Sequence, residues 1–448
     1  MQGFMFLRVN MEKNGLKQKK TEYAAVILLS AVMVAIPLMH YICVKYVVNS
    51  NYLAGSIYFL AIICGVFNCV AAYINRNTMA STIYEKTVAA FLLFAVVSAV
   101  FAEDVHTALW GQPGREEGLF MLISYCIFFY TARLISDGRI RKIAAEVFLL
   151  VQLVHSIYGL MQYFDIYPQK YIIFDSYHYA VSGVAGNPDF MATVMVLSFG
   201  ISLGLLYKCH RKWEKIVYGA AAVIFLWTLV LTKTALGLVG LAAVMLVLFI
   251  SLLKNSKNRC KTAVFLAAAL VAAVCVMEFV FHKGISVRVQ SLMTQFQAMT
   301  DNGFAEGSAA SGRFQIWANS FELARHNLLT GIGIDGLLEP YFENYGLMAG
   351  QYVDKCHNEF LQILVTMGLP ALVSYVSLIV CAADDMICGS KTSQVHFAVM
   401  LGFFGYMAQA MFNISVIDVA PYLWIFMGLT VQPLISEDGP DENLNQAD

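Results

Sequence analysis

The stretch DKCHNEF at residues 354–360 stands directly before the apolar run LQILVTMGLPALVSYVSLIVCA at residues 361–382. A bilayer-spanning helix needs roughly 20 apolar residues, and this run is long enough to form one. The heptapeptide in front of it holds Asp, Lys, Cys, His, Asn and Glu. It is either a hydrated helix end or a catalytic centre at a membrane surface, and the rest of the chain decides between the two.

The composition of the whole chain is that of an integral membrane protein. Of its 448 residues, 59% are hydrophobic and only 13% are charged, and the mean hydropathy is +0.65. Soluble domains carry about 25% charged residues. The net charge of −1 gives no indication of a nucleic-acid partner. The 10 cysteines show neither a CxxC pair nor the spacing of a zinc site, so we expect no disulfide framework and no metal.

We predict an all-α, polytopic membrane protein with about twelve transmembrane helices. The seventh and eighth spans are separated only by Thr232-Lys233-Thr234, so the alternative there is one apolar stretch broken at mid-depth. The candidate spans are residues 24–45, 52–75, 83–101, 117–136, 143–163, 188–207, 216–231, 235–253, 262–282, 358–382, 395–413 and 418–435.

Lysine and arginine placement predicts the orientation. With the N-terminus in the cytoplasm, most of the 29 lysines and arginines fall in cytoplasmic segments, as the positive-inside rule requires. Both termini are then cytoplasmic, and the protein is a multi-pass protein of the cytoplasmic membrane. The predicted organisation is a cytoplasmic segment at 1–22, transmembrane helices one to nine at 23–282, a large external loop at 283–356, transmembrane helices ten to twelve at 357–435 and an acidic cytoplasmic tail at 436–448.

The large external loop is predicted to carry an amphipathic helix. In GRFQIWANSFELARHNLL, at residues 312–329, large apolar side chains recur at helical spacing. They are Phe314, Trp317, Phe321 and Leu328. We expect this helix to lie on the membrane or to cap the bundle, and we expect the Gly-Ile-Gly sequence at 331–333 to end it.

Four basic or titratable positions stand at external span ends or in the large loop: Arg115, Lys233, Arg313 and His357. Each alone has an ordinary interpretation. An arginine beside glutamates pairs with them as an interfacial anchor, and a lone lysine snorkels to the headgroups. An arginine on a surface helix binds lipid phosphate, and a histidine at a span end is a hydrogen-bonded helix terminus.

Taken together, one imidazole and three cations on one membrane face suit a reaction on a lipid diphosphate. Arginine offers a planar fork to phosphate oxygens, and lysine offers a point charge. Histidine accepts a proton near neutral pH. Cys356 beside His357 suggests a thiol nucleophile instead, but adjacent residues of a helix point about 100° apart.

Two regions resemble the signature of the O-antigen ligase and O-antigen polymerase superfamily. They are SGRFQIWANSFELARHNLLTGIGIDG at 311–336 and CHNEFLQILVTMGLPALVSY at 356–375. They hold an Arg near a Trp, a Gly-x-Gly turn, and His-Asn before a Leu-rich span. Three further stretches resemble the family: REEGLFMLISY at 115–125, GVAGNPDFMATVMVLS at 183–198 and QAMFNISVIDVAPYLWIFMGL at 409–429. The likeness covers the chain from about residue 110 to about residue 430.

Two positions depart from the family pattern. The family often has Ser-Arg-Gly after the span end where this chain has Thr232-Lys233-Thr234-Ala235. Lysine keeps the charge but loses the bidentate fork of arginine. The Asn-Pro-Asn pattern is Asn187-Pro188-Asp189 here, which adds an acid near the expected diphosphate site.

The resemblance implies a metal-independent, inverting glycosyltransferase without a cofactor, acting at the outer face of the cytoplasmic membrane. The donor would be a glycan on undecaprenyl diphosphate, and the acceptor a hydroxyl of a glycan or glycolipid. Ligase and polymerase differ only in that acceptor. His357 would act as general base or orient the acceptor hydroxyl. Arg313 and Lys233, with Arg115 as a third candidate, would hold the diphosphate.

The same resemblance gives supporting roles to Asn358, Asp335 and Asn187, behind the residues that touch the substrate. Two other interpretations stay open. Twelve spans also suit a transporter or flippase of lipid-linked glycans, although such proteins usually place ionisable residues at the midplane. A peptidoglycan polymerase of the cell-shape class would rely on an external aspartate, for which Asp301, Asp335 and Asp354 are candidates.

Overall fold

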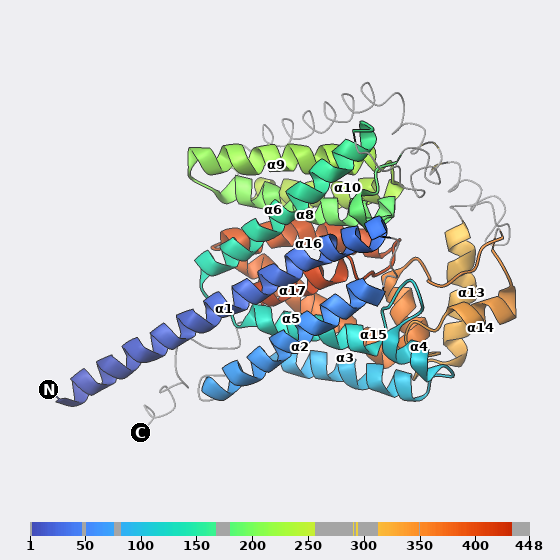
Figure 1. Ribbon diagram of the computed structural model, residues 1–448, viewed down its shortest axis with the longest axis horizontal. Coiled ribbons are helices and arrows are strands. Elements are labelled where there is room, and N and C mark those ends of the chain that lie inside the picture. Colours follow the sequence, from blue (N-terminus) through green and yellow to red (C-terminus); the bar gives the residue numbers. More distant parts are fainter. Residues whose placement is uncertain are drawn as a thin grey trace.

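The structure is a computed structural model that describes residues 2–46, 51–75, 82–166, 180–255, 290, 293, 312–348 and 350–431. The elements of these residues are helices, with one isolated bridge between Met348 and Gln351, so the all-α prediction is confirmed. Figure 1 shows them packed as a bundle. In chain order they are α1 (Gln2–Tyr46), α2 (Asn51–Ile74), α3 (Ile83–Val100), α4 (Val105–Trp110), α5 (Leu119–Arg133), α6 (Gly138–Tyr163), η1 (Gly183–Ala185), α8 (Pro188–Lys208), α9 (Lys212–Leu231), α10 (Ala235–Asn255), α13 (Arg313–His326), α14 (Leu338–Tyr345), α15 (Glu359–Gly389), α16 (Gln394–Ala410) and α17 (Ala420–Thr430).

Eight helices of the described residues are long and apolar enough to cross a membrane. They are α1, α2, α3, α6, α8, α9, α10 and α15. The shorter helices α5, α16 and α17 coincide with three further predicted spans. The predicted span at 262–282 and most of the external loop before residue 312 lie outside the described residues. The count of about twelve spans and the external loop therefore stay predictions.

Residues 232–234 separate two helices rather than kink one. α9 ends at Leu231 and α10 begins at Ala235, and both pack against α8 (Figure 1). One straight helix could not place both of its halves along the same 21-residue partner. The chain therefore turns back at Lys233, whose φ of 54° lies in the left-handed region.

The most deeply buried spanning helix of the described chain is α8, with 83% of its most apolar window inside the protein. Small residues bring its neighbours close. A Cβ added to Gly200 would lie 2.5 Å from the backbone nitrogen of Gly402 in α16, and one on Gly204 would lie 2.4 Å from Cα of Ala398. Membrane helices commonly pack through such small residues, because lipid provides no hydrophobic force between them.

The helix α15 is broken in its first half. Gly368 has φ 84° and ψ 171°, outside the helical region, and Pro370 has no N–H to donate. The carbonyls of Val365 and Thr366 therefore lose the partners that a continuous helix would give them. At membrane depth such groups need another protein partner.

Residues 328–333 provide that partner. Three backbone hydrogen bonds join the segment to the break: Ile332 N–H to Val365 O at 3.0 Å, Gly333 N–H to Thr366 O at 3.1 Å and Leu369 N–H to Leu328 O at 2.7 Å. The two backbones touch directly, since a Cβ on Gly331 would lie 2.2 Å from the carbonyl carbon of Thr366. The loop that follows Gly333 is fixed against α15 by this contact.

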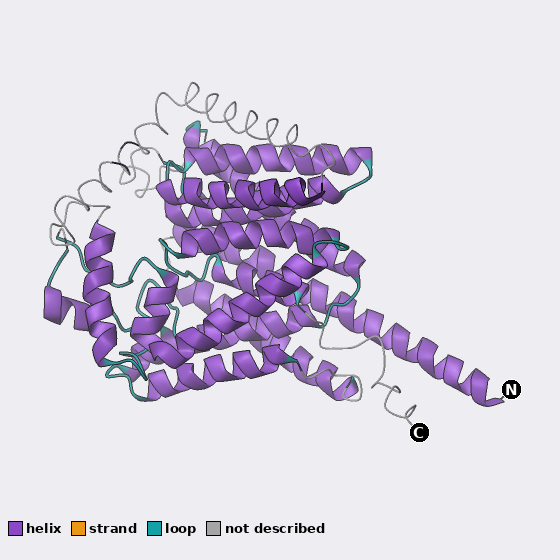
Figure 2. Cartoon of the chain, turned by 180° about the vertical axis from the view of Figure 1, so that it is seen from behind, coloured by secondary structure: helices purple, strands orange, loops and turns teal. Residues whose placement is uncertain are grey.

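The helices α13 and α14 lie at the end of the bundle opposite the N-terminus, here called the α13 end (Figures 1 and 2). The sequence predicted an amphipathic helix here, either on the membrane or capping the bundle, and the structure has the helix α13 at this place. The buried residues of α13 are Ile316, Ser320 and Ala324, whereas Phe321 is 57% exposed. Trp317 packs on Phe412 with ring centroids 5.8 Å apart. The helix ends at His326, before the Gly-Ile-Gly segment rather than at it.

Gly331 and Gly346 allow the cost of an unusual backbone conformation to be told apart from the cost of a steric clash. Gly331 and Gly346 have similar φ values of 68° and 70°, but a Cβ on Gly346 would meet nothing within 4 Å. We expect Gly346→Ala to lower stability by about 1–2 kcal/mol through the left-handed backbone alone. Gly331→Ala should cost about 1–3 kcal/mol more, because its methyl group also pushes the loop off α15.

The thermal unfolding midpoints of the purified variants in detergent would measure this difference. Equal midpoints for Gly331→Ala and Gly346→Ala would contradict the contact between the loop and the break in α15.

Candidate active site

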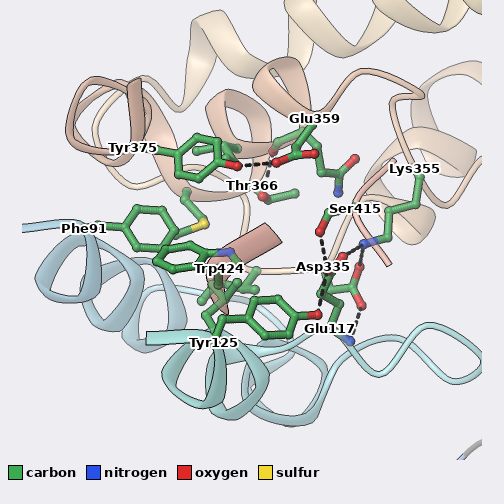
Figure 3. Close-up of a pocket in the computed structure, with 15 residues that line it drawn as sticks. Phe91, Glu117, Tyr125, Asp335, Lys355, Glu359, Thr366, Tyr375, Ser415 and Trp424 are labelled. Carbon is green, nitrogen blue, oxygen red and sulfur yellow. Dashed lines mark hydrogen bonds and ion pairs between the residues drawn. The ribbon is translucent and has the colours of Figure 1, made fainter. Parts of the chain in front are cut away.

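Three segments far apart in the sequence meet at the α13 end around one buried ammonium group. Lys355 Nζ lies 2.7 Å from Asp335 Oδ1 and 3.0 Å from Glu117 Oε2 (Figure 3). All three residues are less than 9% exposed. We call Glu117, Asp335 and Lys355 the buried ion triad. Ser415 Oγ and the Tyr125 hydroxyl also donate to Glu117 Oε1, at 2.6 Å and 3.1 Å.

The turn at residues 111–118 prepares its side of the triad. Gly111 has φ 97°, and a Cβ there would lie 2.2 Å from the backbone nitrogen of Glu117, so the turn closes tightly on itself. This closure aims two backbone N–H groups at Asp335 Oδ2, those of Gln112 at 2.8 Å and Glu117 at 3.4 Å. Asp335 itself sits at φ 59° on the loop that leaves the α15 break.

Burial and pairing act on the triad in opposite directions. Burial raises the pKa of Asp335, and the nearby Lys355 ammonium offsets part of this increase. Burial lowers the pKa of Lys355, but the charges of Asp335 and Glu117 outweigh it and hold the pKa above the ordinary value. Lys355 therefore stays protonated and cannot serve as a base near neutral pH.

A cavity of about 60 Å³ lies behind the triad, with polar groups on one side and aromatic rings on the other (Figure 3). This is room for a few water molecules. Glu359 lines it and accepts hydrogen bonds from the hydroxyls of Tyr375 and Tyr406, the latter at 3.1 Å. The cavity thus adds a second polar group, Glu359 with its two tyrosines, two residues after His357 in the chain.

His357 lies between the triad and the start of α15. Its φ of 50° is left-handed, which turns the chain just before the helix, and Asn358 caps that helix by accepting from Leu361 N–H at 3.0 Å. Burial and the positive charges of Arg313 and Arg115 together lower the pKa of His357 to about 4, against the opposing charge of Asp354. The imidazole is neutral at neutral pH and able to accept a proton.

The two arginines near His357 are each held by an aspartate. Arg115 binds Asp354 through two nitrogens, at 2.6 Å and 3.2 Å, and not through a neighbouring glutamate as the sequence suggested. Within the described part of the chain, Arg313 makes a single longer contact, 3.4 Å from Nη2 to Asp189 Oδ2. Burial raises the pKa of Asp354, but its contact with Arg115 outweighs burial, and the pKa lies below its usual value. The carboxylate is therefore ionised.

The remaining predicted residues have local structural roles. Lys233 is half-buried at the α9–α10 turn, and its charge is not among those that shift His357. Asn187 caps α8 by accepting from Asp189 N–H at 2.8 Å. The structure thus brings together His357, Arg313 and Arg115, and places Lys233 at the turn between α9 and α10.

The sequence analysis missed the triad, although Lys355 stands in the opening heptapeptide. Only the position of Lys355, two residues before His357, could have indicated the triad from the sequence. Cys356 is fully buried, and burial raises its pKa to about 12, which leaves the thiol protonated and inert as a nucleophile. Among the described residues, no group of three or more His, Cys, Asp or Glu side chains is arranged to hold a metal ion.

Removal of Lys355 should lower the stability of the protein. Lys355→Met leaves two carboxylates buried without a cation, and breaking such a buried pair costs about 3–5 kcal/mol. The triple variant Lys355→Met with Glu117→Gln and Asp335→Asn removes both uncompensated charges and should recover much of that loss.

Thermal unfolding midpoints of the two variants beside the parent protein would test this expectation. A triple variant no more stable than Lys355→Met would contradict the assignment of an ion-paired triad in which Lys355 stabilises both carboxylates.

Residues 220–376 match the family model described as O-antigen ligase. They include Lys233, Arg313, Asp335, Lys355 and His357. No curated protein matches the chain at a significant level. The match confirms the resemblance drawn from the motifs, to a family of glycosyltransferase-like membrane enzymes. The match at residues 220–376 supports the assignment of this membrane protein to the O-antigen ligase and O-antigen polymerase superfamily.

Proposed function

We propose that this protein transfers a glycan from undecaprenyl diphosphate to an acceptor hydroxyl at the outer face of the cytoplasmic membrane. The observation that carries the proposal is a half-buried His357 imidazole, neutral at neutral pH, beside two arginines at one end of a membrane helix bundle. A proton acceptor and guanidinium groups are what a glycosyl transfer from a diphosphate requires. The N-terminus at the opposite end supports an external site, given the cytoplasmic N-terminus expected from the charge pattern.

In the proposed step, His357 accepts the proton of the acceptor hydroxyl as its oxygen attacks the anomeric carbon. The bond from that carbon to the diphosphate oxygen breaks on the opposite face, so configuration inverts. Arg313, with one long contact to Asp189 among the described residues, has N–H groups for the leaving diphosphate. Arg115, engaged bidentately by Asp354, adds positive charge near the same place. No step in this scheme calls for a metal ion.

The buried ion triad would act indirectly in this scheme. It anchors Lys355 two residues before His357, and the α15 cap at Asn358 anchors the residue after it. The left-handed backbone of His357 is thereby held from both sides. Positioning within a fraction of an ångström is what general-base catalysis demands of its supporting residues.

The two alternative functions have weaker support. A cell-shape polymerase would need a free external aspartate, yet Asp335 is bound by Lys355 and Asp354 by Arg115. Asp301 lies outside the described residues. A flippase would move lipid-linked glycan without making a glycosidic bond, and the assay below separates it from a transferase.

His357→Ala should abolish transfer, because general-base catalysis typically contributes about 10²–10⁴-fold and the other residues cannot take its place. The measurement is mass spectrometry of products after purified protein in vesicles meets lipid-linked glycan. His326→Ala is the matched control, since His326 is an exposed histidine on α13 with 66% of its side chain in solvent.

Normal glycan products from His357→Ala would overturn the catalytic assignment. Movement of lipid-linked glycan across the vesicle membrane by the parent protein, without new glycosidic bonds, would replace the transferase by the flippase.

The pH profile of kcat/KM should follow the lowered pKa of His357. The base form exists above the pKa, so kcat/KM should fall as pH drops, with a midpoint near 4 rather than 6.5. Arg313→Gln removes one of the charges that lower this pKa, and the midpoint should therefore rise toward 6.5. Arg325→Gln, a 60% exposed arginine on the same helix, should leave the midpoint in place.

Each profile would be normalised to its own plateau, so that weaker donor binding by Arg313→Gln does not hide the midpoint. An unchanged midpoint in Arg313→Gln would contradict the electrostatic coupling between these two residues.

A further inference from the structure

A second hollow opens at the α13 end, distinct from the cavity behind the triad. It encloses about 300 Å³ between α4, the turn at residues 112–113 and the segment 332–340 that leads into α14. Binding sites for small ligands measure about 300–1,000 Å³. The hollow is therefore large enough for a ligand of the size of a sugar unit, and we call it the Glu103–Glu339 cleft.

The walls of the cleft offer acceptors that the protein does not use itself. Glu103 and Glu339 are exposed, and no hydrogen bond or ion pair is recorded for either carboxylate among the described residues. Asp104, by contrast, is occupied: it caps α4 by accepting from His106 N–H at 2.9 Å and from the Thr107 hydroxyl at 2.6 Å. Two carboxylates thus remain for a ligand, one on each side of the cleft.

The rest of the cleft is lined by the backbone of two glycines and by apolar side chains. Gly333 must be glycine, since its φ is 105° and a Cβ would lie 2.7 Å from Cβ of Ala102. Gly336 leaves more backbone uncovered, and Leu338 and Pro340 line the far edge. A sugar ring has hydroxyl groups around its edge and C–H groups on its faces, so a cleft with both kinds of wall matches it.

Charge separates this cleft from the site at His357. The lining of the cleft, as far as the described residues go, contains Glu103, Asp104 and Glu339 but no Lys or Arg. The arginines gather instead around His357. The carboxylates therefore repel a diphosphate, which the arginines near His357 attract. A hydroxyl or an ammonium group, by contrast, can donate a hydrogen bond to the carboxylates of the cleft.

The cleft and the His357 site share a wall. Gln112, which lines the cleft, donates its backbone N–H to Asp335 Oδ2 at 2.8 Å, and Asp335 pairs with Lys355 at 2.7 Å. Lys355 stands two residues before His357. These contacts connect the cleft to the segment that carries His357.

We propose that the Glu103–Glu339 cleft binds an uncharged or amine-bearing sugar unit of a glycan substrate while the His357 site holds the diphosphate. This inference rests on the proposed glycosyl transfer. The sugar belongs either to the acceptor glycan or to the glycan part of the donor, and the two sources share the chemistry that the cleft recognises.

The first test is binding without turnover, by calorimetric titration of the full-length protein in detergent. The probes are the oligosaccharide released by mild acid from lipid-linked glycans of the source cells, and inorganic pyrophosphate. The double variant Glu103→Gln/Glu339→Gln should raise the Kd for the oligosaccharide about tenfold, because hydrogen bonds to charged acceptors are lost. Its Kd for pyrophosphate should stay within about twofold, since its site is elsewhere.

The matched control is Glu322→Gln/Glu343→Gln, which makes the same charge change at acidic positions of α13 and α14 outside the cleft. This control should bind both probes like the parent. Unchanged oligosaccharide binding in Glu103→Gln/Glu339→Gln, or an equal loss in the control, would overturn the proposal.

Kinetics of transfer in vesicles then identify the source of the sugar. A raised KM for the acceptor alone assigns the cleft to the acceptor, and a raised KM for the donor alone assigns it to the donor glycan. If the parent protein makes no glycosidic bond, the proposed function fails, while the titration still decides whether the cleft binds a sugar. If the parent transfers glycan and the double variant changes neither Kd nor KM, only the cleft assignment fails.

Discussion

The backbone break in α15 is the constraint on which the rest of the site depends. Gly368 and Pro370 interrupt the helix and leave carbonyl groups unpaired, and residues 328–333 satisfy them with their own backbone. Unpaired backbone groups at membrane depth are costly, so the break and the inserted segment stabilise each other. The insertion fixes the loop that carries Asp335, and Asp335 in turn fixes Lys355 and the approach to His357. A helix defect thus becomes the support of a polar site.

Electrostatic pairing then decides which groups remain available for chemistry. Lys355 is committed to two carboxylates and Arg115 to one, whereas Arg313 has a single long contact and His357 stays neutral. Unusual backbone conformations also occur at several of the predicted site residues. Of the five non-glycine residues with positive φ in the described chain, Lys233, Asp335 and His357 were predicted site residues. Strained backbone that clusters at one end of a molecule is a common feature of functional sites.

Motif reading predicted the all-α membrane fold, the superfamily and the break between α9 and α10. It failed where partners are distant in sequence. Arg115 stands beside two glutamates, yet it binds Asp354, 239 residues away, because the tight turn at 111–118 directs Glu117 inward to Lys355. The periodicity of α13 also did not show which of its residues are buried, since they are Ile316, Ser320 and Ala324 rather than the aromatic residues that dominate its pattern.

The sequence by itself determined the apolar spans, the points where they break and the set of polar residues that cannot be ordinary span residues. These are local properties, because hydropathy, glycine and proline act on the few residues around them. Only the tertiary structure decided which charges pair with one another, which face of α13 is buried and where a cleft lined by carboxylates without Lys or Arg opens. Those outcomes depend on the convergence of segments more than 200 residues apart, as the 238 residues between Lys355 and Glu117 illustrate, and pairwise electrostatics in a buried site follows distance in space rather than distance along the chain.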